Sequence, residues 1–136
     1  MASISVERTI GKAKKAVLDG LYGYNTEKAG KQKYKRFAVT LRERGRIVGG
    51  IVGEVWMTVL FIQFFWIDQK YRGKDFGTKL IKAIEDEAKK FGAVRSYVDT
   101  MSFQAPGFYR GCGYEEYGAI DGYPGGVTRH WLTKAL

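Results

Sequence analysis

The stretch from Trp66 to Thr78 combines residue types that can hold a phosphate group. An apolar run ends at Ile67, a basic turn with glycines follows, and an amphipathic helical pattern begins near Phe76. Backbone N–H groups in the first turn of a helix have no internal acceptor and lie at the positive end of the helix dipole, so they bind anions. The stretch therefore predicts a site for a phosphorylated ligand.

The elements that would position this turn alternate between strands and helices. Apolar residues at helical spacing predict helices over 7–22 and over 76–91. Gly20 and Gly23 are expected to end the first of these helices, and Ser102 is expected to cap a short third helix. On the second helix, Glu85 with Lys89 and Asp86 with Lys90 should form i,i+4 pairs. Strands are predicted over 3–6, 34–42, 47–56, 59–67, 94–100, 114–120 and 128–136. This order indicates an α/β fold, with one mixed α+β sheet flanked by helices.

Three of these strands have further features. A glycine in the turn 44–46 predicts that 34–42 and 47–56 form a hairpin, and 57–58 should make a second tight connection. The run 59–67 is apolar almost throughout, which is typical of a strand buried on both faces.

Length and composition favour one globular domain over residues 1–136. The chain has 136 residues, 45% of them apolar and 27% charged. Its single cysteine, Cys112, cannot form an internal disulfide and has no cluster of further ligands for a metal, so we expect no metal and a cytoplasmic protein. No secretory pattern is present, and Glu54 and Gln63 interrupt the one apolar stretch long enough to test as membrane-spanning.

The net charge of +9 arises from 23 Lys and Arg against 14 Asp and Glu, and the excess lies mostly between residues 28 and 46. Such a segment steers anionic ligands, and the Tyr, Lys and Arg interleaved over 22–46 would suit a nucleic-acid-binding module. A solvated surface is the simpler interpretation. An acidic partner, nucleic acid or a polyanionic cofactor would each fit this charge, which alone does not choose among them.

Two motifs in the expected order resemble those of the GCN5-related N-acetyltransferases, the GNAT superfamily. Arg72–Gly77 is similar to the loop Arg/Gln-X-X-Gly-X-Gly/Ala, and Ala105–Tyr114 is similar to Ala-X-X-Phe-Tyr-X-X-X-Gly-Phe. The predicted strand 94–100 lies between them, and 99–105 resembles a subgroup of small bacterial members. The resemblance covers almost the whole chain.

This resemblance implies a GNAT fold and an enzyme that transfers the acetyl group of acetyl-CoA to a primary amine of a small molecule or peptide, by direct attack. Tyr109 would donate a proton to the departing CoA thiolate. The strand before the loop would separate from its parallel neighbour, so that a backbone N–H in the gap polarises the thioester. Residues implied to bind acetyl-CoA are Trp66, Ile67, Arg72, Gly73, Lys74, Asp75, Phe76, Gly77, Thr78, Ser102 and Ala105.

Two positions depart from the family pattern. Asp75 stands where the first loop glycine is expected, and it would repel pyrophosphate unless its side chain turns outward and caps the helix. Ser102 stands where many members carry asparagine. A domain with the same fold that binds CoA without turnover is therefore a third alternative.

The general base and the acceptor stay open at this stage. Glu54, Asp68, Asp99 and His130 are candidates for the base, and water could also serve. Members of this family are often dimers, so a homodimer is a possible assembly, with acetyl-CoA and an amine as the expected partners.

Overall fold

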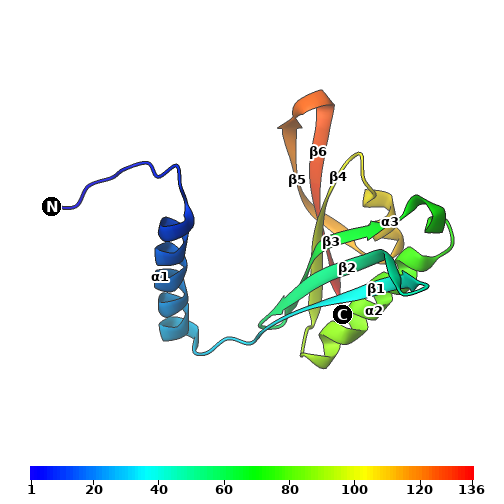
Figure 1. The fold of residues 1–136 in the computed structure, drawn as a ribbon, viewed down its shortest axis with the longest axis horizontal. Helices are drawn as coiled ribbons and strands as arrows, with labels where there is room; N and C mark the ends of the chain where they lie inside the picture. Colours follow the sequence, from blue (N-terminus) through cyan, green and yellow to red (C-terminus); the bar gives the residue numbers. More distant parts are fainter. The chain divides into compact units, whose positions relative to one another are not determined.

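The computed structural model describes residues 1–136, which form two compact units, residues 1–32 and 33–136. Figure 1 draws the whole chain and labels its elements. No helix of the structure is long and apolar enough to cross a membrane. The prediction of a single domain over 1–136 stays a prediction.

The first unit contains one helix, α1 (Gly11–Ala29), and none of its residues is buried. The prediction that Gly20 and Gly23 end this helix is wrong, as is the predicted strand over 3–6. A glycine inside a helix costs about 1 kcal/mol, but it ends the helix only where the backbone turns left-handed. That happens at Gly30, which has φ 75° and donates its N–H to the Thr26 carbonyl at 2.9 Å.

The second unit is built on a six-stranded mixed sheet with the order β1-β2-β3-β4-β6-β5. Only β3 and β4 are parallel; all other neighbours are antiparallel. The mixed sheet and the hairpin of the first two strands confirm the predicted fold class. The strands are β1 (Tyr34–Glu43), β2 (Arg46–Trp56), β3 (Val59–Ile67), β4 (Arg95–Met101), β5 (Glu115–Tyr123) and β6 (Val127–Ala135).

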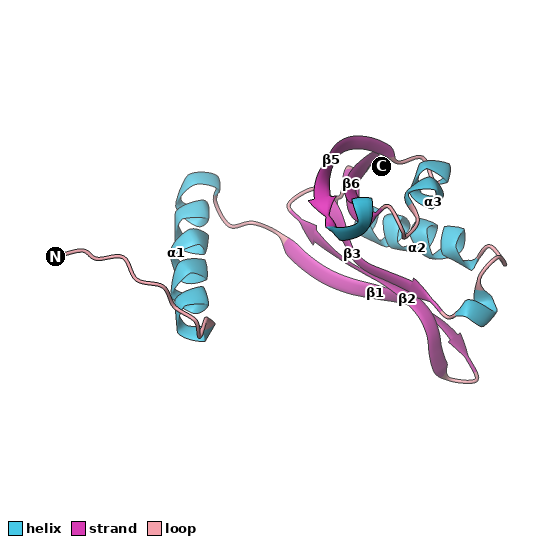
Figure 2. Ribbon diagram, turned by 90° about the horizontal axis from the view of Figure 1, so that it is seen from above, coloured by secondary structure: helices cyan, strands magenta, loops and turns pink.

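Helices α2 (Phe76–Lys90) and α3 (Pro106–Gly111) both lie on one face of the sheet (Figure 2). α2 buries Leu80, Ile81, Ile84 and Ala88 in the core, where each large apolar side chain contributes about 1.5–3 kcal/mol. The short 3-10 turns η1 (Gln69–Tyr71) and η2 (Pro124–Gly126) complete the unit. No helix of this unit covers the other face, which we call the open face; it carries Glu54, Phe61, Tyr97, Asp99 and Trp131 in register.

The i,i+4 pairs predicted for Glu85 and Lys89 and for Asp86 and Lys90 are wrong. Asp86 instead pairs with Lys82 at 2.9 Å, on the exposed side of α2. Glu85 follows Ile81 by four residues, so it lies on the buried face, and its side chain turns into the core.

A β-bulge at Gln63 changes which face β3 presents. Val52 is paired with Phe64 but Gly53 with Ile62, so Gln63 is an extra residue on β3. Phe64 is consequently 70% exposed and Trp66 52% exposed, which corrects the prediction that β3 is buried on both faces. The parallel pairing with β4 ends at the same point, at Ile62 and Val98. The separation of these strands that the resemblance implied is therefore present.

Candidate active site

The turn after β3 forms an open cradle of backbone donors. Gly73 and Asp75 adopt left-handed backbone conformations, with φ 71° and φ 68°, and redirect the chain into α2. The first backbone bond of the helix is donated by the Lys79 N–H to the Asp75 carbonyl at 3.3 Å. The N–H groups of the residues before Lys79 in the first turn therefore have no backbone acceptor. This arrangement suits an anion such as pyrophosphate.

A cavity of about 650 Å³, here called the phosphate cavity, opens above this turn. Its walls come from the end of β3, the start of α2 and the segment that leads into α3. Among the residues predicted to bind acetyl-CoA, those that line it are Trp66, Ile67, Arg72, Gly73, Asp75, Phe76, Gly77, Thr78 and Ala105.

Two predicted cofactor residues, Lys74 and Ser102, do not line the phosphate cavity. The Lys74 ammonium lies 5.9 Å from the centroid of the Tyr71 ring. The Ser102 hydroxyl accepts a hydrogen bond from the Thr128 N–H at 3.1 Å, so it ties the segment after β4 to β6. Ser102 also does not cap α3, whose N-cap residue is Ala105.

The side chains of Arg72 and Asp75 differ from the simplest expectation. Arg72 Nε donates to the Ile67 carbonyl at 2.9 Å, which braces the loop and engages the backbone of a residue that the resemblance implied to bind acetyl-CoA. Asp75 makes no side-chain cap, so the outward capping conformation is not the one observed. Asp75 is nevertheless among the residues that line the phosphate cavity.

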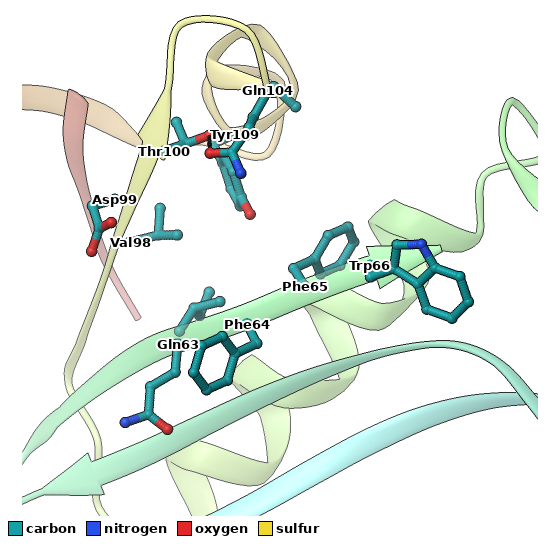
Figure 3. A pocket seen from close by; sticks show the side chains of 11 residues that line it. Gln63, Phe64, Phe65, Trp66, Val98, Asp99, Thr100, Gln104 and Tyr109 are labelled. Carbon is teal, nitrogen blue, oxygen red and sulfur yellow. Dashed lines mark hydrogen bonds between the residues drawn. The ribbon is translucent and has the colours of Figure 1, made fainter. Parts of the chain in front are cut away.

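A second cavity of about 380 Å³, the gap cavity, lies where β3 and β4 separate. Its wall includes Asp99 of the open face and Tyr109 of the helix side, so it reaches through the sheet (Figure 3). It shares Phe65, Trp66, Gln104 and Ala105 with the phosphate cavity, so the two cavities adjoin, and together they are called the channel.

Sequence reasoning missed Phe65 and Gln104 as site residues. Gln104 Oε1 accepts hydrogen bonds from the Met101 N–H at 2.7 Å and from the Thr100 hydroxyl at 3.2 Å. These bonds fix the segment that forms the shared wall. Gln104 lies within the stretch that resembles small bacterial members, which was the available signal; Phe65 could be assigned only from the bulge.

Tyr109 is 6% exposed, and its hydroxyl points toward the gap cavity in Figure 3. Its ring packs edge-on against Phe65, Phe108 and Tyr114. Burial is the main cause that raises the pKa of Tyr109 from 10.0 to about 12, and the nearby Cys112 and Asp99 add to it. The phenol therefore keeps its proton at neutral pH and can donate it.

Each side chain considered as a general base already has a partner. Glu54 accepts from the Tyr34 hydroxyl and pairs with Arg36, and Asp99 accepts two bonds from Arg129, the shorter at 2.6 Å. The other two candidates lie in structural contacts: Asp68 accepts from the Lys70 N–H at 3.0 Å, and His130 Nδ1 contacts Glu116.

Cys112 is half-buried, and burial raises the pKa of its thiol, with the Glu85 carboxylate as the next cause. A protonated thiol is a poor nucleophile. Cys112 packs against the hydrophobic core of the second unit.

Comparison with known proteins identifies the family. Residues 10–114 match the model of the acetyltransferase (GNAT) family. A blasticidin-S acetyltransferase of Streptomyces morookaense is 43% identical over 95 residues, which are 69% of this chain and 70% of that protein. An acetyltransferase from Bacillus cereus has a crystal structure that is 30% identical, with a TM-score of 0.88 and 98% of each chain covered.

An aminoglycoside 6′-N-acetyltransferase solved with coenzyme A shares the fold, with a TM-score of 0.65, 18% identity, and 99% of this chain and 97% of that chain covered. These findings agree with the phosphate cradle, the separated strands and the buried tyrosine. The chain therefore belongs to the GNAT acetyltransferase family and is an acetyl-CoA-dependent N-acetyltransferase, as the resemblance of its sequence indicated.

Proposed function

We propose that the enzyme acetylates a primary amine of a small molecule or peptide by direct attack, with both substrates bound at once. The observation that carries this proposal is the pair of adjoining cavities, one of which lies over the phosphate loop while the other reaches Asp99 of the open face. Acetyl-CoA enters from the helix side and the amine from the open face. The reacting atoms meet beside Tyr109.

In this proposal the loop Arg72–Thr78 holds the pyrophosphate through its backbone N–H groups, and Arg72 and Lys74 add positive charge. The pantetheine arm lies along the end of β3 near Trp66, and Ala105 forms the facing wall. The acceptor nitrogen forms the new C–N bond as the C–S bond breaks. Tyr109 gives its proton to the leaving sulfur, and the proton lost from the amine passes to water.

The cofactor part of this proposal is tested by calorimetric titration with acetyl-CoA. The Arg72→Glu, Gly77→Glu variant should lose binding at least tenfold, since it places carboxylates in the cradle and crowds Phe108, which lies 3.1 Å from a Cβ at position 77. Lys82→Glu is the matched control, because Lys82 lies on the exposed side of α2. Equal affinities in all three proteins would refute the assignment of the loop. Binding of oligonucleotides instead of acetyl-CoA would favour the nucleic-acid alternative.

The catalytic part is tested by Tyr109→Phe, which should lower kcat roughly 100-fold and leave acetyl-CoA affinity unchanged. An unchanged kcat would remove Tyr109 from the reaction. Release of free CoA is a suitable measure of kcat, because free CoA is a product whichever amine accepts the acetyl group.

We propose blasticidin S as the first acceptor to test, because the 43% identical relative is a blasticidin-S acetyltransferase. Saturable release of CoA with blasticidin S would support this acceptor. If it is inert, a panel of small amines and peptide amino termini should follow.

A homodimer and a cytoplasmic location also remain proposals. β5 is an edge strand of the sheet, and its Tyr117 and Ile120 are 58% and 54% exposed, so it offers an apolar edge to a second copy. Sedimentation velocity would show a dimer, and Tyr117→Lys with Ile120→Lys should convert it to a monomer.

A further inference from the structure

We propose that Glu85, Tyr114 and Lys134 form a positioning unit that holds Tyr109 in its reactive orientation. This inference rests on the proposed role of Tyr109 as the proton donor. None of the three side chains lines the channel. They act through Tyr109 and do not touch the substrates.

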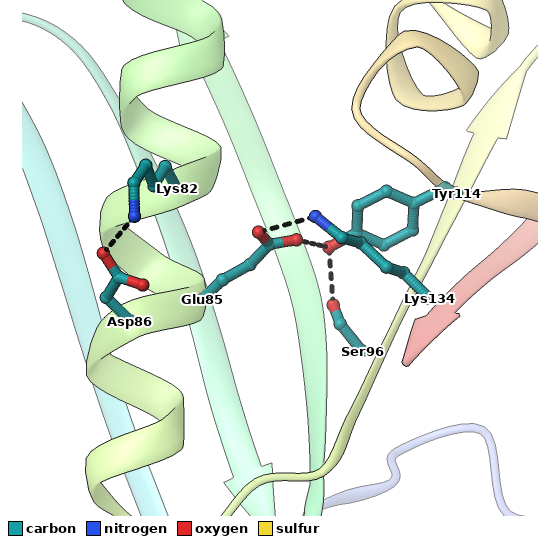
Figure 4. Close-up of polar contacts among 6 residues, drawn as sticks. All are labelled: Lys82, Glu85, Asp86, Ser96, Tyr114 and Lys134. Carbon is teal, nitrogen blue, oxygen red and sulfur yellow. Dashed lines mark hydrogen bonds and ion pairs between the residues drawn. The ribbon is translucent and has the colours of Figure 1, made fainter. Parts of the chain in front are cut away.

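With Ser96, the unit joins α2, β4 and β6 to the residue that precedes β5, all of them distant in sequence (Figure 4). Glu85 of α2 is 6% exposed, and its two carboxylate oxygens have different partners. Lys134 of β6 lies 2.9 Å from Oε1, and the Tyr114 hydroxyl donates to Oε2 at 2.8 Å. Ser96 Oγ of β4 lies 2.8 Å from the same phenol oxygen. A phenol has one proton, so the Ser96 hydroxyl is the donor in that second bond.

The side chain of Tyr114 is thereby held at its single polar atom, the phenol oxygen, which has two hydrogen-bond partners. Its ring is 2% exposed, and the Lys134 ammonium lies 5.6 Å from the ring centroid. If the Tyr114 phenol rotated away, the buried Glu85 carboxylate would lose a hydrogen-bond donor. The position of the Tyr114 ring is therefore strongly determined.

Two contacts transmit this position to Tyr109. The Tyr114 N–H donates to the Tyr109 carbonyl at 3.0 Å, across the left-handed Gly113 with φ 95°. The two rings also meet edge-on, with centroids 6.0 Å apart.

Helix α3 has six residues, too few to hold its own orientation in isolation. Its end is therefore held by Tyr114, and through Tyr114 by α2. Since a proton donor must lie within hydrogen-bond reach of the atom it serves, a small rotation of α3 would weaken catalysis more than it weakens binding.

The test is a double-mutant cycle between Tyr114→Phe and Tyr109→Phe, read as kcat and as KM for acetyl-CoA. Tyr114→Phe removes one oxygen and should lower kcat roughly tenfold with KM unchanged, because the phosphate loop is intact. In the Tyr109→Phe background the same change should alter kcat less than about twofold, since the group being positioned is gone. Asp86→Asn is the control, because Asp86 makes an exposed ion pair on the same helix.

Equal losses from Tyr114→Phe in both backgrounds would overturn the inference and assign the unit to stability alone. An unchanged kcat in Tyr109→Phe alone would instead refute the proposed function. If Tyr114→Phe does not fold, Lys134→Met serves in its place, because it leaves the Tyr114 hydroxyl and its bond to Glu85 intact. The same non-additive pattern is expected there, and additivity would overturn the inference.

Discussion

Replacing Lys134 by methionine should lower the free energy of unfolding by about 2 to 3 kcal/mol. Glu85 is 6% exposed and its Oε1 lies 2.9 Å from the Lys134 ammonium, so the change leaves a buried carboxylate with the Tyr114 hydroxyl as its remaining strong partner. Removing one member of a fully buried ion pair costs about 3–5 kcal/mol. The Lys134 side chain is 28% exposed, which admits some water and places the expected loss at or below the lower end of that range. Methionine keeps the apolar stem against the Tyr114 ring, so packing changes little.

Urea unfolding at pH 7, followed by circular dichroism, measures this loss as a shift of midpoint at constant slope. The control is Lys82→Met, whose ion pair with Asp86 joins side chains that are 75% and 48% exposed, and it should change stability by less than about 0.5 kcal/mol. Adding Glu85→Gln to Lys134→Met should recover part of the loss, because the unpaired charge is then gone. A Lys134→Met protein within about 0.5 kcal/mol of wild type would refute the reasoning, since it would show that water screens the pair.

Two other predictions concern the site. Asp75→Gly should stabilise the protein by about 1 kcal/mol in thermal unfolding, because Asp75 has φ 68°, which glycine adopts without strain. The same change removes a carboxylate from a residue that lines the phosphate cavity, so calorimetry should show tighter binding of acetyl-CoA. Unchanged affinity would show that this carboxylate does not oppose the ligand. Because the pKa of Tyr109 rises from 10.0 to about 12 on folding, its stabilising contribution is fully present below pH 10 and is lost as the pH rises toward 12. The whole loss amounts to about 3 kcal/mol, about half of which falls below pH 11, so between pH 9 and 11 Tyr109→Phe should lose about 1.4 kcal/mol less stability than wild type, and parallel losses would contradict this.

Local patterns predicted the parts of the fold that local chemistry determines. The hairpin of β1 and β2 follows from a turn in which Arg44 and Gly45 have φ 50° and φ 77°, as the glycine indicated. The phosphate loop was visible because glycines, basic residues and the start of α2 are neighbours in sequence. These features need no knowledge of distant contacts.

Long-range contacts explain the failures. Glu85 has the spacing of a surface pair with Lys89, but its partner Lys134 is brought beside it by β6. The extent of α1 depended on a backbone turn at Gly30, which glycine content alone does not locate. The roles of Phe65 and Gln104 depend on where β3 and β4 separate, a property of the paired sheet.

The bulge at Gln63 has a consequence for variation in this chain. Because side chains alternate between faces with a period of two, the extra residue shifts every following position of β3 from one face to the other. Deleting Gln63 would remove the bulge and keep Phe64 and Trp66 on the open face, because the pairs Gly53–Ile62 and Val52–Phe64 would then follow one another directly. Exchanging Gln63 for another polar residue leaves this alternation intact. The deletion would therefore straighten β3 at the point where its pairing with β4 ends, whereas a substitution would keep the bulge, so the gap between these strands depends on the number of residues in β3 more than on the identity of residue 63.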